Sequence, residues 1–352
     1  MKKILTILIP TYNMEKYLDR CLSSLLVDDE RMNRFEALII NDGSKDKSSE
    51  IAHAYQERYP DTYIVIDKEN GHYGSCINRG LQEASGTFVR ILDADDCFDT
   101  AVFTRFLDFL SRNEISEKAD IVLSDYIDVD NELNPYRELK YSNYDGPVSL
   151  NEISEHDMLE WFMPGITYRT SLPLDHSYRQ LEGVAYTDQE WAFTPAAYAK
   201  ALYRFGESLY LYVHGREGQT VNDAVHARNL HVEIQVIERL ISTYGSISEQ
   251  IVPESRLFLR KRLRLLSTHM YQYYLLTFLR YKPSITELRS FDQFLKEQDP
   301  ALYTEISDYT TRIVGISFQP ITDWRNGNKA RLLLQQSLYR LADWKNHLSS
   351  KN

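Results

Sequence analysis

The sequence predicts an α/β protein with a mainly parallel, Rossmann-like sheet that has helices on both faces, followed by a smaller α-helical region. Short apolar runs alternate with stretches of helical periodicity as far as about Ser124, a pattern typical of a parallel sheet. After about Val225 no apolar run of strand type remains, and Leu- and Tyr-rich helical patterns replace it. A chain of 352 residues also exceeds the usual size of one domain. We therefore expect two domains, 1–225 and 226–352, with the first divided into halves of about 1–127 and 128–225.

The first apolar run, 4–9, is too short for a helix and stops at Pro10, so we expect a buried parallel strand there. Apolar residues then recur at helical spacing from about Glu15 to Val27, which predicts a helix. The same alternation continues along the chain. Further strands are expected at 37–40, 63–66, 88–92 and 121–124, and further helices from the turn at 41–44 to about 59, at 75–84 and at 102–111.

Residues 128–182 are less regular, because proline and glycine interrupt them repeatedly. We expect loops, short strands and one helix around 158–162 in this part. The later elements expected are a helix at 186–201, a strand at 208–213, and helices at 230–244, 254–281, 285–297 and 330–348.

The formal net charge is −11, which argues against a general nucleic-acid binder because phosphate backbones need a basic surface. The charge is unevenly distributed along the chain. Residues 1–230 contain 23 Lys and Arg against 39 Asp and Glu, whereas residues 231–352 contain 17 against 12. An acidic front part is therefore joined to a mildly basic tail.

Cysteine usage and hydropathy indicate the compartment. Cys21, Cys76 and Cys97 lack CxxC spacing, and the N-terminus leads into a strand-length run rather than a signal peptide. No stretch approaches the roughly 18 apolar residues that cross a bilayer. We expect a cytoplasmic protein, with peripheral attachment to the inner face of the membrane as the alternative.

Polar and acidic residues follow three of the expected strands. The segments are Pro10-Thr11-Tyr12-Asn13, Asn41-Asp42-Gly43-Ser44-Lys45-Asp46 and Asp93-Ala94-Asp95-Asp96. Because the carboxyl ends of parallel strands converge on one crevice, these segments are expected to be neighbours. Carboxylates gathered there could hold a divalent cation and the diphosphate of a nucleotide. Taken singly, such a segment is more often an ordinary turn or a solvated loop than a binding site; the order and placement of all three together point to a site.

Together these motifs resemble the family 2 glycosyltransferases of the GT-A fold. The resemblance lies in the segments 7–13, 41–46, 70–81 and 92–96. It extends over roughly the first 215 residues and is most specific in the first hundred. It implies a GT-A catalytic domain at 1–225, with the nucleotide-sugar half at about 1–127 and the acceptor half at about 128–225.

The resemblance also implies roles for individual residues. Those implied to bind the nucleotide or donor are Pro10, Thr11, Tyr12, Asn13, Asp42, Gly74, Asn78, Asp93, Ala94, His214 and Arg216. Asp42 would accept a hydrogen bond from the base, for which a uracil N–H is suitable. Asp95 would bind Mg²⁺ or Mn²⁺, while Asp93 would bind the ribose or assist the metal and His214 is a further candidate ligand.

The general base of an inverting transfer falls on Asp188 in the same resemblance, within 186–191. Thr187 departs from the usual glutamate of the family's Glu-Asp pair. The alternative is that Thr187 or Asp188 only caps a helix, and Glu190 is the fallback base. For Asp96, helix capping and a role in the site are both open.

Two loops complete the implied donor site. In the glycine-bearing loop, Ile77 stands where the family often has arginine, which leaves one diphosphate contact in doubt, with Arg79 as an uncertain substitute. The late loop around His214 and Arg216 would fold over the diphosphate, and its glycines would let it move as a lid. A surface loop without such a role is the alternative.

The sequence thus predicts a metal-dependent, inverting glycosyltransferase that uses a nucleotide sugar, most simply UDP-linked. The acceptor would be a hydroxyl of a surface glycan, a polymer or a lipid-linked oligosaccharide. A sugar-phosphate nucleotidyltransferase is the competing enzyme class, although the Gly-rich, basic signature of that class is replaced here by residues 10–13. A catalytically inactive nucleotide-binding scaffold is the third hypothesis.

The basic, Leu- and Tyr-rich segment 257–281 has two interpretations. It could lie on an anionic membrane surface, or its aromatic residues could pack within the helical domain, on the catalytic domain or across a homodimer.

Overall fold

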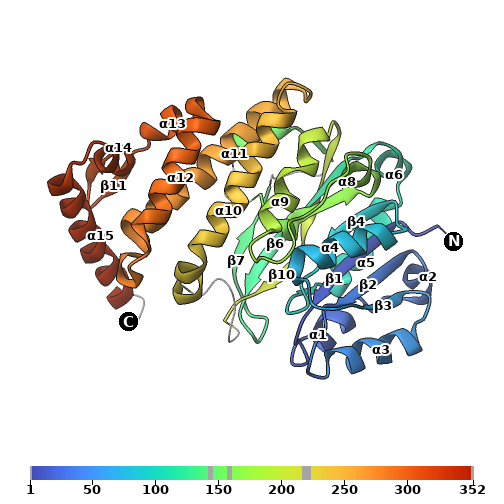
Figure 1. Cartoon of the computed structure of the whole chain (residues 1–352). Helices are drawn as coiled ribbons and strands as arrows, with labels where there is room; N and C mark the ends of the chain where they lie inside the picture. The colour runs from blue at the N-terminus through green and yellow to red at the C-terminus, as the bar shows by residue number, and fades with distance from the viewer. Residues whose placement is uncertain (1, 142–145, 157–160, 216–222, 350–352) are drawn as a thin grey trace. The chain divides into compact units, whose positions relative to one another are not determined.

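The computed structural model describes residues 2–141, 146–156, 161–215 and 223–349 (Figure 1). The chain forms two compact units, one of Met1–Glu217 with Ile251–Phe258 and one of Gly218–Gln250 with Leu259–Asn352. The short segment Ile251–Phe258 belongs to the first unit. A single domain boundary near residue 225 therefore does not separate the two units completely. The domain boundary at residue 225 itself stays a prediction.

A ten-stranded sheet forms the centre of the first unit. Its main path runs β3-β2-β1-β4-β9-β6-β10-β5, with β7 on β6 and β8 on β10. The strands are β1 Leu5–Thr11, β2 Phe35–Asn41, β3 Tyr63–Asp67, β4 Phe88–Ile91, β5 Cys97–Phe98, β6 Ile121–Val129, β7 Pro135–Leu139, β8 Gly146–Val148, β9 Ile166–Arg169 and β10 Leu202–Val213.

Most strands of the sheet run in one direction, which confirms the predicted mainly parallel sheet. Strands β3, β2, β1 and β4 pair in parallel, as do β6 and β10. Strand β9 is antiparallel to both β4 and β6 and so joins the two parallel groups. All seven residues of β2 are buried, as expected for a strand covered on both faces.

The register brings three strand ends to one edge of this sheet. Thr11 of β1 lies opposite Asn41 of β2, and Leu8 of β1 lies opposite Ile91 of β4. The polar segments that follow these three strands therefore start side by side, as the parallel topology requires.

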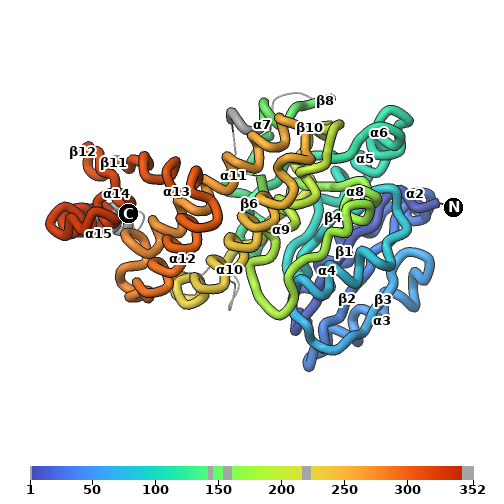
Figure 2. Tube along the Cα trace, turned by 45° about the horizontal axis from the view of Figure 1, so that its top comes forward, coloured from blue at the N-terminus to red at the C-terminus, as the bar shows by residue number. Residues whose placement is uncertain are grey.

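Helices pack on both faces of the sheet (Figures 1 and 2). The helices of this unit are α1 Leu18–Ser23, α2 Asp29–Met32, α3 Ser48–Arg58, α4 His72–Glu83, α5 Thr100–Leu110, α6 Asn113–Lys118, α7 Leu150–His156, α8 Ser171–Asp175 and α9 Asp188–Phe193. Helix α5 illustrates how the sequence determines where a helix begins and which side it buries. Asp99 accepts a hydrogen bond from Val102 N (2.9 Å) at the start of the helix. Apolar residues at i, i+3 and i+4 spacing face the sheet.

The prediction of one helix over 186–201 is wrong. Helix α9 ends at Phe193, a 3₁₀ turn follows at Pro195–Tyr198, and β10 begins as early as Leu202. Pro195 offers no N–H to continue the α-helical ladder. Of the helix expected around 158–162, residues 157–160 lie outside the described residues, and the helix that the structure has nearby is the earlier α7.

The second unit is mainly helical, as predicted. Its helices are α10 Asp223–Ile247, α11 Pro253–Gln272 with the π-helical turn Tyr273–Thr277, α12 Ile285–Gln298, α13 Pro300–Ser307, α14 Pro320–Arg325 and α15 Lys329–Ser349, with the first residues of α11 in the first unit. The expectation that strands end before this part is wrong, because Thr311–Ile313 (β11) and Ile316–Phe318 (β12) pair as a hairpin. Val314 and Gly315, at φ 48° and 81°, form its two-residue turn.

Residues of the segment 257–281 mostly pack inside the protein. Leu259, Leu263 and Tyr271 are fully buried, and Arg260 pairs with Asp299 (2.5 Å) and Glu305 (2.9 Å). These contacts favour the packing interpretation of this segment over membrane attachment. Within the described part of the chain, no helix has both the length and the apolar composition that crossing a membrane requires.

Candidate active site

Three aspartates form a compact cluster directly after β4. Asp93, Asp95 and Asp96 each offer a carboxylate oxygen, and these atoms lie within 4.8 Å of one another. Asp95 is 8% exposed and Asp96 is fully buried. Carboxylate oxygens at this separation are the donor set that Mg²⁺ and Mn²⁺ prefer. Hence the residues present fit a hard divalent cation.

Asp96 links the acid cluster to the far end of the sheet. Its carboxylate accepts hydrogen bonds from Tyr210 Oη (2.6 Å) and from Val213 N (2.8 Å), both on β10. Burial, and then the charges of Asp95 and Asp93, raise the pKa of Asp96 well above its ordinary value. Because Asp99 caps α5, the helix-capping interpretation of Asp96 is wrong.

Asp93 is held by two tyrosines. Its Oδ1 accepts a hydrogen bond from Tyr73 Oη (2.9 Å), and its backbone N donates to Tyr210 Oη (3.2 Å). Desolvation of the Tyr73 hydroxyl, followed by the charges of Asp93 and Asp188, raises the pKa of this tyrosine. Tyr73 therefore lies within the electrostatic reach of both the acid cluster and Asp188.

Asp188 is the first residue of α9. Its charge raises the pKa of Tyr73 and of Tyr212, two residues that the charge of Asp93 also affects. Thr187 makes no side-chain cap; instead its Oγ1 accepts a hydrogen bond from Gln180 Nε2 (2.9 Å). After desolvation, which is the largest cause, both Asp188 and Asp93 thus raise the pKa of the same two tyrosines, and Thr187 does not act as a helix cap.

Glu190, the fallback base, has a structural partner. It is 2% exposed, and its Oε2 accepts a hydrogen bond from Leu181 N at 2.6 Å. A carboxylate held in this way fixes the segment before α9 and is poorly placed to meet an acceptor from solvent.

The start of α4 is clamped to the segment 180–182. Asn78 accepts a hydrogen bond from Gln180 N (2.8 Å) and donates to Gln180 O (2.8 Å) and to Glu182 Oε1 (2.8 Å). A Cβ on Gly74 would lie 1.9 Å from Leu181 O, so only glycine permits this approach. Both predicted donor residues, Gly74 and Asn78, therefore also join the two halves of the first unit.

Ile77 and Arg79, the two residues for which a contact with the diphosphate was in doubt, have other surroundings. Ile77 is fully buried, while Arg79 is half exposed and pairs with Glu83 (2.7 Å) one helical turn along α4. Arg20, on α1, approaches the acid cluster instead: its Nη2 donates to Asp95 O at 2.9 Å.

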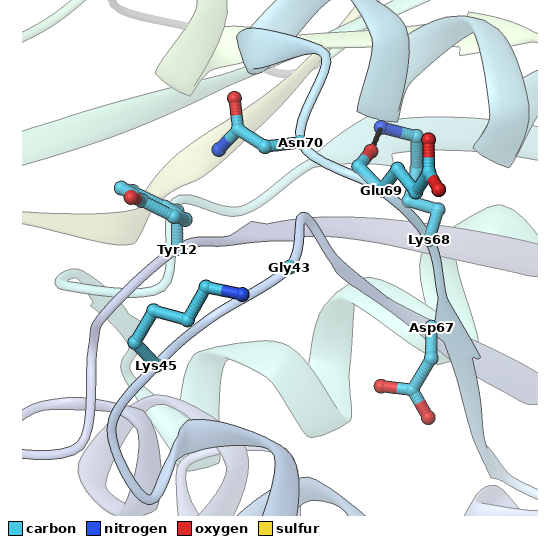
Figure 3. A pocket seen from close by; sticks show the side chains of 7 residues that line it. All are labelled: Tyr12, Gly43, Lys45, Asp67, Lys68, Glu69 and Asn70. Carbon is cyan, nitrogen blue, oxygen red and sulfur yellow. Dashed lines mark hydrogen bonds between the residues drawn. The ribbon is translucent and has the colours of Figure 1, made fainter.

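A pocket of about 570 Å³ opens beside the ends of β1, β2 and β3 (Figure 3). The residues that line it are Tyr12, Gly43, Lys45, Asp67, Lys68, Glu69 and Asn70. Figure 3 shows the side chains of Tyr12, Lys45 and Asn70 around Gly43, and Tyr12 is 46% exposed. An exposed ring at a polar pocket suits stacking on a flat ligand.

Asp42 lies behind this pocket and is almost completely buried. Its Oδ1 accepts hydrogen bonds from Lys68 Nζ (2.5 Å) and Gly71 N (2.9 Å), and Lys68 also donates to Ser75 Oγ (2.8 Å). Asn13, at φ 55°, accepts a hydrogen bond from the backbone N of Lys45 (2.8 Å) and so ties the first loop to the second.

The remaining residues predicted for the nucleotide lie at the end of β1 and in the acid cluster. Thr11 is buried, and its carbonyl accepts a hydrogen bond from Asp42 N (2.8 Å), next to the half-buried Pro10. Ala94 is fully buried between Asp93 and Asp95.

Replacing Lys68 with methionine is expected to lower the free energy of unfolding by about 2 kcal/mol, because it leaves the buried Asp42 carboxylate without its cationic donor. Urea unfolding would measure the change. Lys45→Met, at the exposed side of the same pocket, is the matched control and should leave stability within about 0.5 kcal/mol of wild type. Equal losses in the two variants would contradict the structural role of the Lys68–Asp42 pair.

His214 lies beyond β10 and is partnered by another aspartate. Its Nε2 is 3.2 Å from Asp128 Oδ1, and its ring centroid is 4.4 Å from that of Tyr212. The acid cluster found among the described residues does not include His214. Arg216 lies outside the described residues.

Comparison with known proteins agrees with this geometry. Residues 6–159 match the family model described as Glycosyl transferase family 2, and this range contains all three strand-end segments and the acid cluster. The segment 6–159 is therefore identified as family 2 glycosyltransferase sequence.

Curated relatives of this chain are similar over its first part. The chain is 34% identical over 116 residues to the uncharacterized glycosyltransferase EpsJ of Bacillus subtilis, which is 33% of each protein. It is 26% identical over 224 residues to the putative glycosyltransferase EpsH of the same organism, with 59% of this chain and 60% of EpsH covered. The minor teichoic acid biosynthesis protein GgaB of B. subtilis is 32% identical over 31% of this chain and 12% of GgaB. The matches thus cover 12% to 60% of these relatives, in each case less than two thirds.

Solved structures share the fold over most of the chain. The crystal structure of S. aureus TarS 1-349 in complex with UDP-GlcNAc superposes with a TM-score of 0.54 over 89% of this chain and 95% of TarS 1-349. At 16% sequence identity this likeness concerns the fold alone. It agrees with the GT-A-like sheet predicted from the sequence.

Several residues of the candidate site were missed by sequence reasoning. They are Arg20, Lys68, Tyr73 as a partner of Asp93, Gln180 and Tyr210. Lys68 directly follows Asp67 at the end of β3, so its position at a parallel strand end was the one available signal. Tyr210 lies 114 residues after Asp96, and nothing local in the sequence pairs the two.

Proposed function

We propose that this chain is a metal-dependent, inverting glycosyltransferase that moves a sugar from a UDP-linked donor to an acceptor hydroxyl. The observation that carries the proposal is that Asp188 and the acid cluster, from distant parts of the sequence, act electrostatically on the same two tyrosines, Tyr73 and Tyr212. The cluster Asp93, Asp95 and Asp96 comes from β4, and Asp188 comes from α9. Glycosyl transfer by single displacement needs acid groups of this kind on either side of the reacting carbon.

The nucleotide would occupy the pocket at the ends of β1, β2 and β3. Tyr12 would stack on the base, and Asp42 would accept the ring N–H, with the hydrogen bond from Lys68 orienting its carboxylate. Pro10, Thr11 and Asn13 would shape the first loop, and Asp93 with Ala94 would contact the ribose. A uracil base supplies the N–H donor that a carboxylate at this position requires.

The acid cluster would hold Mg²⁺ or Mn²⁺ chiefly through Asp95, with Asp93 assisting. A cation bound there would stabilise the negative charge that develops on the departing diphosphate. Tyr210 and Val213 hold Asp96 so that its carboxylate supports the cluster from behind. His214 and Arg216 would contribute further donors to the diphosphate, and the backbone at Gly74 and the side chain of Asn78 would shape the wall beside it.

Asp188 would act as the general base. As the acceptor hydroxyl attacks the anomeric carbon, the proton of the hydroxyl passes to the Asp188 carboxylate and the bond to the nucleoside diphosphate breaks on the opposite side. One displacement of this kind inverts the configuration of that carbon. Gln180 and Thr187 fix the backbone that leads into Asp188.

The acceptor would be a hydroxyl of a surface glycan, a polymer or a lipid-linked oligosaccharide made at the inner face of the membrane. The relative GgaB carries the name of a teichoic acid biosynthesis protein, and TarS was solved with UDP-GlcNAc, which supports a sugar nucleotide and a cell-surface product. The family match favours glycosyl transfer over nucleotidyl transfer. An inactive scaffold would bind the donor but not turn it over.

A thermal-shift experiment tests the donor and the metal together. UDP with Mn²⁺ is expected to raise the melting temperature, because a ligand at about 100 times its Kd stabilises the folded state by about 2.7 kcal/mol. Asp95→Ala should abolish the metal-dependent part of the shift. Asp61→Ala, an exposed carboxylate outside the site, should keep it in full. A shift that Asp95→Ala leaves intact would overturn the metal assignment, and the absence of any shift with UDP would overturn the donor assignment.

A further inference from the structure

Three of the leucines of helix α15 are exposed, whereas Leu332 and Leu338 are partly buried. Leu333, Leu334 and Leu341 are 62%, 50% and 56% exposed, whereas Gln335 is completely buried and donates through Nε2 to Asp323 Oδ2 (2.5 Å). Gln336 donates in the same direction, to Leu275 O (3.1 Å). A surface helix ordinarily packs its leucines inward and shows its amides to water. The reversed arrangement means that the contacts of α15 within its own unit do not explain these three exposed leucines.

The three leucines form one surface, the outer face of α15. Their spacing of one, seven and eight residues keeps them on one side of a helix. Strand β11 packs beside α15 in the same unit (Figures 1 and 2), and the hairpin turn next to it exposes Val314 (63%) and Ile316 (51%). Exposed apolar side chains thus gather at this end of the second unit.

The outer face of α15 is also basic. No acidic residue occurs from 329 to 342, while Lys329, Arg331 and Arg340 are all exposed. Lys329 and Arg340 stand four residues before and seven residues after Leu333, which places them on the leucine side of the helix. Arg331 is turned to the inner side, where it pairs with Asp323 at 3.1 Å.

We propose that the outer face of α15 docks on an anionic membrane surface. Exposed leucines flanked by lysine and arginine match the chemistry of the lipid interface, where acyl chains accept the apolar residues and anionic headgroups attract the cations. A second copy of this chain fits the face less well, because two identical faces would bring the same positive charges together. This surface lies on α15 and not on the segment 257–281, for which membrane contact was one of two interpretations of the sequence.

Docking of this face would be independent of the proposed transfer reaction. None of its residues belongs to the acid cluster, the nucleotide pocket or the segment that carries Asp188. Loss of docking should therefore leave the binding of UDP with Mn²⁺ unchanged, so that failure of this inference and failure of the proposed function are separable.

Vesicle flotation of the full chain tests the inference. At low salt the protein is expected to float with vesicles of phosphatidylcholine and phosphatidylglycerol (7:3) and not with phosphatidylcholine alone. Leu333→Gln combined with Leu341→Gln should lower the bound fraction at least tenfold, because the apolar contribution to binding is lost. Lys329→Gln combined with Arg340→Gln should weaken binding about 25-fold, since each basic residue near an anionic surface contributes about fivefold.

Matched controls separate this face from other exposed apolar residues. Leu257→Gln changes a leucine of α11 that is 47% exposed, and Leu174→Gln changes one of α8 that is 45% exposed; both should bind vesicles like the wild type. Circular dichroism would verify that each variant is folded. A wild type that does not float, or a Leu257→Gln variant that loses as much binding as the α15 variants, would overturn the inference. So would light scattering that shows a wild-type dimer dissociated by the α15 substitutions without vesicles, because the face would then be a contact between copies.

Discussion

Asp188→Asn is expected to lower the rate of sugar transfer by about a thousandfold while leaving donor binding unchanged. A positioned general base contributes 10²–10⁴-fold to a reaction of this kind, and asparagine has nearly the same shape but cannot take the proton. The release of UDP from UDP-sugars in the presence of Mn²⁺ would measure turnover, and the thermal shift with UDP would measure binding. A variant that binds donor but does not release UDP would locate the loss in the chemical step.

The matched control for this substitution is Glu190→Gln on the same helix. Glu190 accepts a hydrogen bond from Leu181 N, and a glutamine oxygen can accept the same bond. This variant should therefore keep turnover within about threefold of wild type. If Glu190→Gln abolishes UDP release while Asp188→Asn does not, the base has been assigned to the wrong carboxylate. If both variants and the wild type release no UDP from any sugar nucleotide that binds, the scaffold hypothesis is favoured.

Gly74→Ala is expected to cost about 3 kcal/mol of stability and to impair turnover as well. The added Cβ would lie 1.9 Å from Leu181 O and 2.8 Å from Leu181 C, both backbone atoms that cannot rotate away. Helix α4 or the segment 180–182 must move, so the hydrogen bonds between Asn78 and Gln180 weaken. Because this segment leads into Asp188, the displacement should reach the site. Urea unfolding and UDP release would measure the two effects.

Gly80→Ala on the same helix is the control for this prediction. Its Cβ would lie 2.7 Å from Leu8 Cδ2 and 3.2 Å from Ile40 Cδ1, the ends of side chains that can shift. The loss should therefore be smaller, about 1 kcal/mol, with turnover retained. Equal losses at both positions would mean that crowding of the core, rather than the contact with Leu181, explains the need for glycine.

The parallel part of the sheet could be predicted because each strand and the helix that follows it are neighbours in the sequence. Runs such as 37–40 are each followed by a turn and a helix, so a buried strand and the helix that packs on it lie within about 25 residues of each other. Short strands were expected within 128–182, but the position of β9 could not be given, and the hairpin β11–β12 was missed, because strands of three or four residues carry little periodicity. The early start of β10 was missed because Gly206 interrupts its apolar pattern, where the pairing with β6 shifts in register.

The candidate site could be predicted only where its residues follow strands. The acid cluster and Asp42 stand directly after β4 and β2, so topology alone brings them to one edge. The partners that hold them could not be predicted in this way. Tyr210, Lys68 and Gln180 act through side-chain contacts across long intervals of sequence, and such contacts depend on packing that no local pattern records.

The bonds from Tyr210 and Val213 to Asp96 have a consequence for biosynthesis. A nascent chain that has left the ribosome only as far as residue 159 already contains all three clustered aspartates, but it lacks the strand whose hydrogen bonds hold and orient Asp96. Until that strand arrives, mutual repulsion should keep these acids apart and exposed to water. We therefore expect the acid cluster to reach its final arrangement late in translation, after the chain is complete through about Val213.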